Sequence, residues 1–126
     1  MIQLFTGVDL IEIDRLAAVA PAIRVRFLQR IYTSRELDEC RDADSSLAGR
    51  FAAKEAVAKA LGCGIGPIAW QEIEILRSDS GAPAVYLHGN AHEISGQLGI
   101  ETWSLSISHS RTHAVAMVVG AVLCQK

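Results

Sequence analysis

Residues 47–61, LAGRFAAKEAVAKAL, form a predicted helix with two apolar faces. At about 100° per residue, one face has the larger side chains, namely Leu47, Phe51, Ala58 and Leu61. The second face has almost no side-chain bulk and consists of Gly49, Ala52, Ala53, Ala56 and Ala60. Because such a face lets another backbone approach closely, we expect the helix to be packed on both of these sides.

The charged residues of this helix lie on the two edges between the apolar faces: Arg50 with Lys54, and Glu55 with Lys59. We expect all four charges to be exposed. Glu55 and Lys59 have the favoured order for an i,i+4 ion pair, which contributes only about 0.3–0.5 kcal/mol. The same residues at the rim of a groove would belong to a binding site, and spacing alone does not decide between these interpretations.

Two further features favour a site. Glycines 62, 64 and 66 follow the helix, and glycine loops can present backbone N–H groups to phosphate. These groups lie at a helix C-terminus, where the macrodipole disfavours anions, so a bound phosphate needs Lys54, Lys59 or a metal ion. The second feature is Asp9, which interrupts a hydrophobic strand and is costly to bury without a cation. Asp9 and Glu55 together suggest Mg²⁺, which proteins hold through one or two carboxylates plus substrate phosphates.

The composition predicts one domain spanning residues 1–126, with 50% hydrophobic and 21% charged residues. We find no apolar stretch long enough to cross a membrane and no basic region typical of a signal peptide. The three cysteines (Cys40, Cys63 and Cys124) are far apart and predict reduced thiols in a cytoplasmic protein. The net charge of −2 argues against nucleic-acid binding.

A basic segment stands out in this mildly acidic chain. Residues 15–35 contain five arginines and no acidic residue, which suggests an acidic partner. A solvated helix face would produce the same pattern, so this interpretation also stays open.

The order of the predicted elements indicates an α+β fold. Strands are expected at 4–13, 70–76, 82–89, 103–110 and 113–123, the last of them more fully buried than 103–110. Residues 70–76 and 82–89 are expected to form a hairpin around Asp79-Ser80-Gly81. Helices are expected at 15–31, 33–40 and 90–99, and a further helix should begin at residue 44 or 45 and end at the glycines from residue 62 on. Pro21 should break or start a helix within 15–31, and Thr33 or Ser34 should cap the helix at 33–40.

Three motifs together resemble the short, holo-acyl-carrier-protein-synthase type of 4′-phosphopantetheinyl transferase, over nearly the whole chain. GVDLIEIDRL (7–16) resembles the family's N-terminal G-x-D motif, and GRFAAKEAVAKALGCGIG (49–66) resembles its F-x-x-K-E-A-x-x-K-A-x-G-x-G motif. LSISHSRTHAVAMVV (105–119) is similar to its C-terminal strand-loop-strand. The family transfers the phosphopantetheine arm of coenzyme A to a serine of apo acyl carrier protein and releases adenosine 3′,5′-bisphosphate, a step of fatty acid biosynthesis.

The resemblance also implies roles for individual residues. Asp9 and Glu55 would hold Mg²⁺ against the coenzyme A pyrophosphate, and Lys59 would lie at the β-phosphate under attack or at the bridging oxygen. Glu55, or a metal-bound water that it orients, would accept the serine proton. Arg50, His109 and Ser110 would contact the nucleotide end, and Lys54 and the backbone at Gly62 to Gly64 would complete the phosphate site. The other histidines (88, 92 and 113) share no spacing, and we assign them structural or surface positions.

For partners, the resemblance implies an acidic acyl carrier protein and a homotrimer with active sites between subunits. The residues expected to bind the carrier are Arg15, Arg24, Arg26, Phe27 and Arg30. Two other classes compete with this hypothesis: a Mg²⁺-dependent nucleotide pyrophosphohydrolase, which would need a cluster of several acidic ligands, and a non-catalytic nucleotide-binding scaffold.

Overall fold

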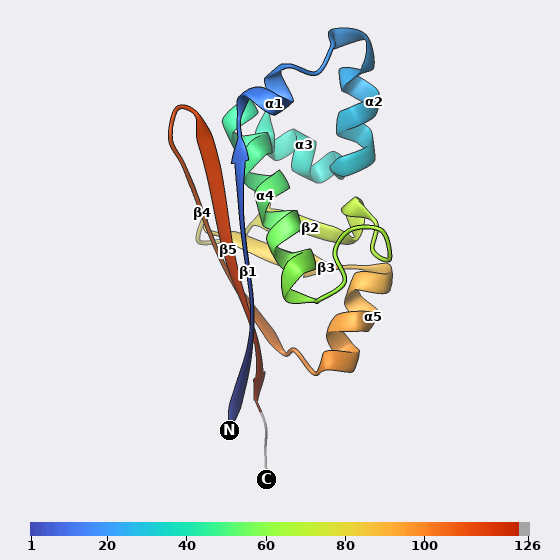
Figure 1. The fold of residues 1–126 in the computed structure, drawn as a ribbon, viewed down its shortest axis with the longest axis vertical. Coiled ribbons are helices and arrows are strands. Elements are labelled where there is room, and N and C mark those ends of the chain that lie inside the picture. Colours follow the sequence, from blue (N-terminus) through green and yellow to red (C-terminus); the bar gives the residue numbers. More distant parts are fainter. Residues whose placement is uncertain (124–126) are drawn as a thin grey trace.

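The computed structural model describes residues 1–123, so Cys124 lies outside the described residues. These residues form two antiparallel β-sheets and five α-helices, with four helices in succession after β1 and most of the strands in the second half, which confirms the α+β prediction (Figure 1). The elements are β1 (Ile2–Glu12), α1 (Asp14–Ala17), α2 (Pro21–Ile31), α3 (Ser34–Cys40), α4 (Asp44–Ala60), the 3₁₀ turn η1 (Trp70–Glu72), β2 (Ile73–Arg77), β3 (Pro83–Leu87), α5 (Gly89–Leu98), β4 (Thr102–His109) and β5 (His113–Leu123).

The larger sheet has the strand order β1-β5-β4, and β2 and β3 form a separate hairpin. On β1, alternate residues including Gly7, Asp9 and Ile11 lie on the face that packs against α4. Asp9 therefore points toward α4 although its neighbours in sequence, Val8 and Leu10, are exposed on the opposite face. This alternation is the period of two that a β-strand imposes on its side chains.

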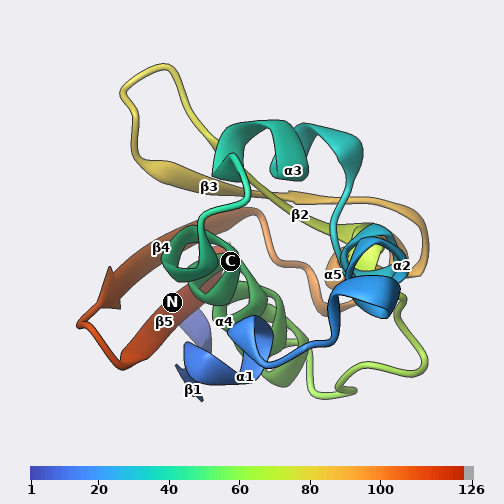
Figure 2. The same cartoon turned by 90° about the horizontal axis from the view of Figure 1, so that it is seen from above.

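The central element is α4, which lies between the three-stranded sheet on one side and α3 with the β2–β3 hairpin on the other (Figure 2). Both predicted apolar faces of this helix are covered: Leu47, Ala52, Ala53, Ala56 and Ala58 have no exposed surface. The expectation of a helix packed on two sides is confirmed. Because α4 is fixed on both sides, it can hold charged side chains in defined positions at its edges.

The backbones of β1 and α4 are in direct contact at Gly7. A Cβ atom placed on Gly7 would lie 1.8 Å from the carbonyl oxygen of Ala56, so no larger residue fits between strand and helix. Gly49 is similarly placed, with its Cβ position 2.8 Å from Ile107 Cγ2 on β4. The small residues of α4 thus set its distance from the sheet.

Several predicted boundaries are refined. Pro21 starts α2, and the preceding residues form only the short helix α1. Thr33, not Ser34, caps α3 and forms a capping box with Glu36. Residues 70–72 form a 3₁₀ turn instead of the start of a strand, since the Glu72 carboxylate accepts a hydrogen bond from the Ala69 N–H at 2.7 Å. Among residues 1–123, no helix is both long and apolar enough to span a membrane.

The prediction that the C-terminal strand is more fully buried than β4 is confirmed, because Ala114, Ala116, Val118 and Gly120 of β5 are buried whereas β4 has no fully buried residue. The residues of β5 that point away from α4 are half-buried or exposed in the single chain, and Met117 is 53% exposed. Together with β1 they form an apolar surface that we call the outer sheet face. Its most exposed members are Ile2, Leu4, Val8, Leu10 and Met117.

Candidate active site

Asp9 and Lys59 are in direct contact. The Lys59 ammonium donates to Asp9 Oδ1 at 3.1 Å and to the Val8 carbonyl oxygen at 3.0 Å. The Lys59 side chain keeps 53% of its surface exposed, so it can still reach a ligand, whereas Asp9 is only 19% exposed. Among the described residues, the ion pair of Lys59 is therefore with the strand carboxylate of Asp9 and not with Glu55, which favours the interpretation as a site over that of an i,i+4 surface pair.

Glu55 lies one helical turn before Lys59 and faces the same edge of β1. Burial raises the pKa of Glu55, the negative charge of Asp9 raises it further, and the positive charge of Lys59 partly offsets both effects. The Asp9 carboxylate thus lies close enough to disfavour the charged form of Glu55, and two neighbouring carboxylates form an electrostatic site for a further cation.

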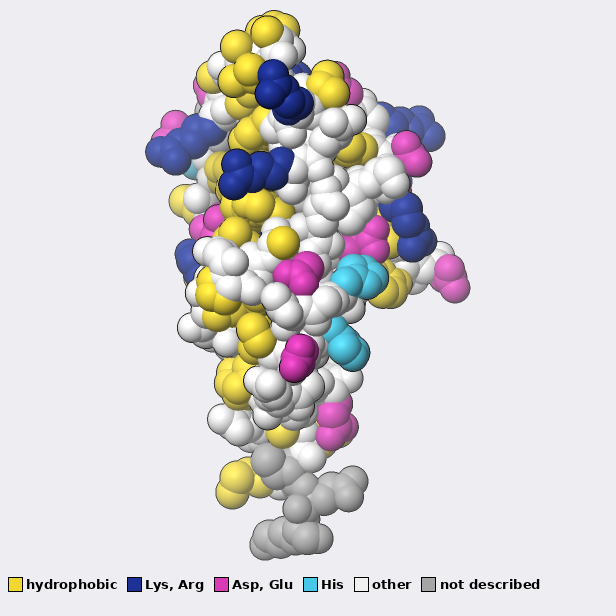
Figure 3. Space-filling view, turned by 90° about the vertical axis from the view of Figure 1, so that its right-hand side faces the viewer, with side chains coloured by type: hydrophobic (Ala, Val, Ile, Leu, Met, Phe, Trp, Pro, Cys, Tyr) yellow, Lys and Arg dark blue, Asp and Glu magenta, His cyan; other side chains and the backbone are white. Residues whose placement is uncertain are grey.

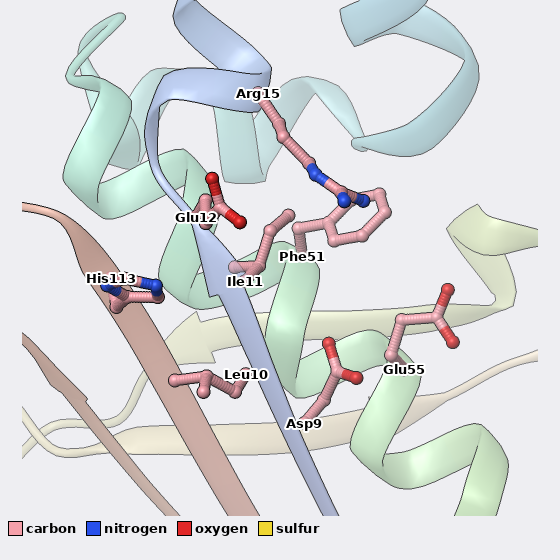
Figure 4. Close-up of a pocket in the computed structure, with 8 residues that line it drawn as sticks. All are labelled: Asp9, Leu10, Ile11, Glu12, Arg15, Phe51, Glu55 and His113. Carbon is pink, nitrogen blue, oxygen red and sulfur yellow. The ribbon is translucent and has the colours of Figure 1, made fainter.

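A surface pocket of about 440 Å³ opens beside these residues (Figure 4). Asp9 and Glu55 extend from β1 and α4 near one end of the pocket, and Arg15 extends toward Phe51 near the other. The remaining lining residues are Leu10, Ile11, Glu12 and His113. The pocket therefore combines three carboxylates, a guanidinium group and an aromatic ring in one concave region.

The donor chemistry of this pocket fits Mg²⁺. Asp9 and Glu55 offer hard carboxylate oxygens, and Mg²⁺ is typically bound through one or two such groups, with waters and substrate phosphates completing the octahedron. Among residues 1–123 there is no group of three or more His, Cys, Asp or Glu side chains placed to hold a metal. The cluster of several acidic ligands that the competing pyrophosphohydrolase would need is thus not found in this part of the chain.

Lys54 takes a different position from the one we expected. The prediction that it lies on an exposed edge is wrong, since its side chain is fully buried. Its ammonium group contacts Glu36 Oε1 at 2.8 Å and donates to the carbonyl oxygens of Ile73 at 2.5 Å and Trp70 at 3.1 Å. Burial lowers the pKa of Lys54, and the charge of Glu36 opposes this effect. With its ammonium group enclosed by protein, Lys54 is not placed to contact a phosphate in the pocket.

Arg50 is also buried, so the expectation of an exposed charge is wrong here too. Its guanidinium donates to the Ile75 carbonyl oxygen at 2.7 Å and pairs with Glu39 at 2.9 Å. Arg50 lines a second, smaller pocket of about 190 Å³ together with His109 and Arg77. No residue is shared between this pocket and the one lined by Asp9 and Glu55.

Arg50 is therefore separated from the predicted metal site within one chain, whereas His109 and Ser110 lie closer to it, in a depression that shares Leu10 and His113 with the pocket of Asp9 and Glu55. Ser110 lies beyond the second pocket, in the turn between β4 and β5, where it lines a shallow neighbouring depression with His109 and His113. Arg77 has no motif that would have identified it, because it lies at the end of an ordinary hairpin strand. His113, which we had assigned a structural or surface position, lines the pocket of Asp9 and Glu55.

The glycine loop closes α4. Gly62 and Gly64 have φ values of +82° and +68°, which glycine adopts without strain. Their N–H groups donate to the carbonyl oxygens of Lys59 at 3.0 Å and Ala58 at 3.3 Å. These N–H groups are occupied by the helix end, and we do not include them among the groups available to phosphate.

Comparison with known proteins identifies the family. The model of the 4′-phosphopantetheinyl transferase superfamily matches residues 6–118. The chain belongs to the 4′-phosphopantetheinyl transferase superfamily. It is 48% identical over 125 residues to a holo-[acyl-carrier-protein] synthase of Herpetosiphon aurantiacus, covering 94% of this chain and 98% of the relative.

Solved structures of the superfamily have the same fold. The holo-[acyl-carrier-protein] synthase of Helicobacter pylori in complex with coenzyme A superposes with a TM-score of 0.83 at 36% identity, covering 91% of this chain and 98% of that one. The synthase from Neisseria meningitidis gives a TM-score of 0.82 at 33% identity, covering 92% and 96%. The predicted family, the α+β fold and the prediction that the chain is an enzyme of the holo-[acyl-carrier-protein] synthase type are confirmed.

In this transferase, the predicted carrier-binding arginines do not all lie together. Arg26, Phe27 and Arg30 line an open groove of about 530 Å³ on α2, beside the exposed side chain of Ile23. Figure 3 shows basic side chains beside apolar ones over the upper part of this face, where α2 lies. Arg15 instead lines the pocket of Asp9 and Glu55.

Arg24 differs from the other α2 arginines. Its guanidinium donates to Asp42 at 3.0 Å, to Asp44 at 2.9 Å and to the Leu16 carbonyl oxygen at 3.1 Å. These hydrogen bonds raise the pKa of Arg24, and they fasten α2 to the start of α4. We therefore assign Arg24 a structural role and leave it out of the proposed carrier-binding surface.

Proposed function

We propose that the protein transfers the 4′-phosphopantetheine arm of coenzyme A to a serine of an apo acyl carrier protein. The relatives named as holo-[acyl-carrier-protein] synthases support this reaction, as does the coenzyme A complex of the Helicobacter pylori enzyme. The observation that carries the proposal is that Asp9 and Glu55 line one pocket and Lys59 contacts Asp9, in a chain of the transferase superfamily.

In this reaction the serine oxygen attacks the phosphorus that bears the pantetheine arm. The bond from that phosphorus to the bridging oxygen of the pyrophosphate breaks, and adenosine 3′,5′-bisphosphate leaves. The serine proton passes to Glu55, directly or through an intervening water. Burial and the charge of Asp9 raise the pKa of Glu55, which makes its carboxylate a stronger base.

Asp9 and Glu55 would hold Mg²⁺, which when bound offsets the charge of the pyrophosphate and orients its oxygens. Lys59, already fixed by Asp9 and the Val8 carbonyl, would place its ammonium beside the phosphate under attack. Arg15, at the other end of the same pocket, would add positive charge where the substrate enters. Such preformed charges act strongly because they need no rearrangement during the reaction.

We propose further that the active enzyme is a homotrimer, in which the nucleotide end of coenzyme A binds residues of a neighbouring copy. Arg50, His109 and Ser110 are the residues of that second part. The proposal is supported by the separation of the two pockets within one chain and by the apolar outer sheet face. A second copy placed against this face would bury its side chains and bring one chain's His109 toward another chain's Asp9.

The carrier protein would bind at α2. Arg26 and Arg30 provide unpaired positive charge on either side of the half-buried Phe27, and such charges steer and orient an acidic partner. The product, a carrier protein bearing the phosphopantetheine arm, would serve fatty acid biosynthesis in the cytoplasm.

One incubation with coenzyme A, Mg²⁺ and an apo acyl carrier protein tests this function. A mass gain of one phosphopantetheine group on the carrier, dependent on Mg²⁺, is the expected result. Cleavage of coenzyme A without modification of the carrier would identify a hydrolase. Absence of any turnover, with nucleotide binding retained, would identify a scaffold.

A further inference from the structure

The outer edge of strand β2 is covered by side chains instead of by another strand. In an antiparallel pair, alternate residues direct both backbone groups away from the partner strand. On β2 these residues are Ile73, Ile75 and Arg77. Four of their outward backbone groups are hydrogen-bonded to side chains of α3 and α4. Lys54 donates to the Ile73 carbonyl oxygen, and Arg50 donates to the Ile75 carbonyl oxygen. Glu36 accepts from the Ile75 N–H, and Glu39 accepts from the Arg77 N–H.

The four side chains also form two ion pairs, Lys54–Glu36 at 2.8 Å and Arg50–Glu39 at 2.9 Å. The cations are four residues apart on α4, and the carboxylates are three residues apart on α3. The two cations therefore lie on one face of α4, and the two carboxylates lie on one face of α3. We call these two pairs the β2-edge pairs. They tie α4, α3 and β2 together at points one helical turn apart.

The Lys54–Glu36 pair is completely enclosed. Neither side chain has exposed surface, and Glu36 accepts from the Thr33 N–H and the Ile75 N–H, both at 2.8 Å, in addition to its contact with Lys54. A buried pair of this kind adds little net stability, because desolvation costs about as much as the attraction returns. Its directional bonds nevertheless fix the position of the residues that make them.

The opposite side of α4 packs on the sheet mainly through van der Waals contacts of small residues, as at Gly7 against Ala56 and Gly49 against Ile107. Such contacts set the distance between helix and sheet. The β2-edge pairs add directional polar bonds on the other side of the helix, at the position of Lys54 and Arg50.

We propose that Glu36 and Lys54 are positioning residues for Glu55. Lys54 immediately precedes Glu55 on α4, and its ammonium group is hydrogen-bonded to the Ile73 and Trp70 carbonyl oxygens. These bonds set the rotation of α4 about its axis at this position, so that the Glu55 carboxylate faces Asp9. Lys59, one turn further along, is directed toward Asp9 by the same rotation. The inference rests on the proposed function, since it assigns Glu36 and Lys54 a task in forming that site.

Two variants separate positioning from simple stability. Lys54→Met removes the ammonium group and leaves the Glu36 charge buried without its partner, so it should lower the melting temperature. It should also weaken Mg²⁺ binding in the presence of coenzyme A by about 10- to 100-fold and reduce kcat by a similar factor. Losses of this size are typical when residues that orient metal ligands are changed. The double variant Glu36→Gln/Lys54→Met removes the unpaired charge and should recover much of the melting temperature, because neutral replacements of buried ion pairs are often tolerated. It should not recover Mg²⁺ affinity or kcat, since the bonds from α4 to the β2 carbonyls are still missing.

Glu74→Gln is the matched control. Glu74 is buried on β2 and binds Thr33 and His88, but it makes no hydrogen bond to α4. It should lower the melting temperature while leaving Mg²⁺ binding and kcat close to those of the unchanged protein. All variants are compared by calorimetric Mg²⁺ titration, steady-state transfer and thermal unfolding, at a temperature where each is folded.

Recovery of Mg²⁺ affinity together with the melting temperature in the double variant would overturn the inference, as would normal Mg²⁺ affinity in folded Lys54→Met. If the unchanged protein transfers no phosphopantetheine, the proposed function fails. The calorimetric titration then still decides whether Glu36 and Lys54 position the carboxylates.

Discussion

The Lys59 ammonium group bridges strand and helix, at 3.1 Å from Asp9 Oδ1 and 3.0 Å from the Val8 carbonyl oxygen. The lysine is thus oriented before any substrate binds. A cation held in this way stabilises developing phosphate charge without first losing its own freedom of movement.

The first prediction concerns this group. Lys59→Met should lower kcat for phosphopantetheine transfer by about 10²- to 10³-fold, the usual effect of losing one preorganised group that stabilises the transition state. The variant also loses the two hydrogen bonds of Lys59, and each loss should lower the free energy of unfolding by at most about 0.5–1.5 kcal/mol. Transfer measured by mass spectrometry, together with urea unfolding, checks both effects. A variant with normal kcat would remove Lys59 from the reaction.

Asp9→Asn and Glu55→Gln test the metal site. Each keeps the size of the side chain but removes one anionic ligand, so each should abolish Mg²⁺-dependent transfer while the protein stays folded. Calorimetric Mg²⁺ titration in the presence of coenzyme A should show weakened binding in both. Glu12→Gln, which changes an exposed carboxylate in the same pocket, is the matched control. Equal losses in all three variants would show that net charge, and not metal ligation, is what matters.

Gly7→Ala tests the close approach of β1 and α4. The added methyl group would lie 1.8 Å from the Ala56 carbonyl oxygen, so strand and helix must separate. We expect destabilisation by about 1–3 kcal/mol, as for other overpacked sites, and a larger loss of transfer, because Asp9 moves away from Glu55. Denaturant unfolding and transfer rates of the folded fraction measure the two effects separately. Unchanged transfer would mean that the distance between the carboxylates is not critical.

The sequence was sufficient to predict this close approach and most of the elements. Alanine and glycine at helical spacing predicted the covered face of α4, and Asp9 within a hydrophobic segment predicted a strand carboxylate that meets a cation. Both follow from local pattern and from the cost of burying charge, which a single segment reveals.

The direction of Lys54 and Arg50 could not be predicted in the same way. Their burial depends on Glu36, Glu39 and the free edge of β2, which come from distant parts of the chain and have no common motif. Helical spacing places the two cations on one edge, but it does not tell whether solvent or a strand edge lies there. The ion pairs of Arg24 could not be predicted for a similar reason, because its partners Asp42 and Asp44 follow 18 and 20 residues later.

The distinction among the α2 arginines is itself testable. Arg30→Glu should raise the KM for the carrier protein, and leave the KM for coenzyme A nearly unchanged, because it reverses an exposed charge in the proposed carrier groove. The effect should decrease as salt screens the surface charges. Arg35→Glu, an equal charge change at the exposed start of α3, should have little effect on either constant. Equal increases in the carrier KM for both variants would indicate that overall charge, and not the α2 groove, determines binding.

The last prediction concerns Glu74 and pH. Burial by itself raises the pKa of Glu74, but the hydrogen bonds from Thr33 at 2.6 Å and His88 at 3.0 Å outweigh this effect and leave the pKa lowered. A carboxyl group with a lowered pKa in the folded state stabilises the protein at pH values above its unfolded pKa of about 4.3. That contribution is lost as the pH falls through the folded pKa, because below it the group is protonated in both the folded and the unfolded state.

Glu74→Gln should therefore reduce the free energy of unfolding at pH 6 and have a smaller effect at pH 3, as measured by urea unfolding at both pH values. Glu93→Gln, at an exposed position on α5, should show no such difference. An effect of Glu74→Gln that is equal at both pH values would mean that lost packing, and not the ionised carboxylate, accounts for the destabilisation.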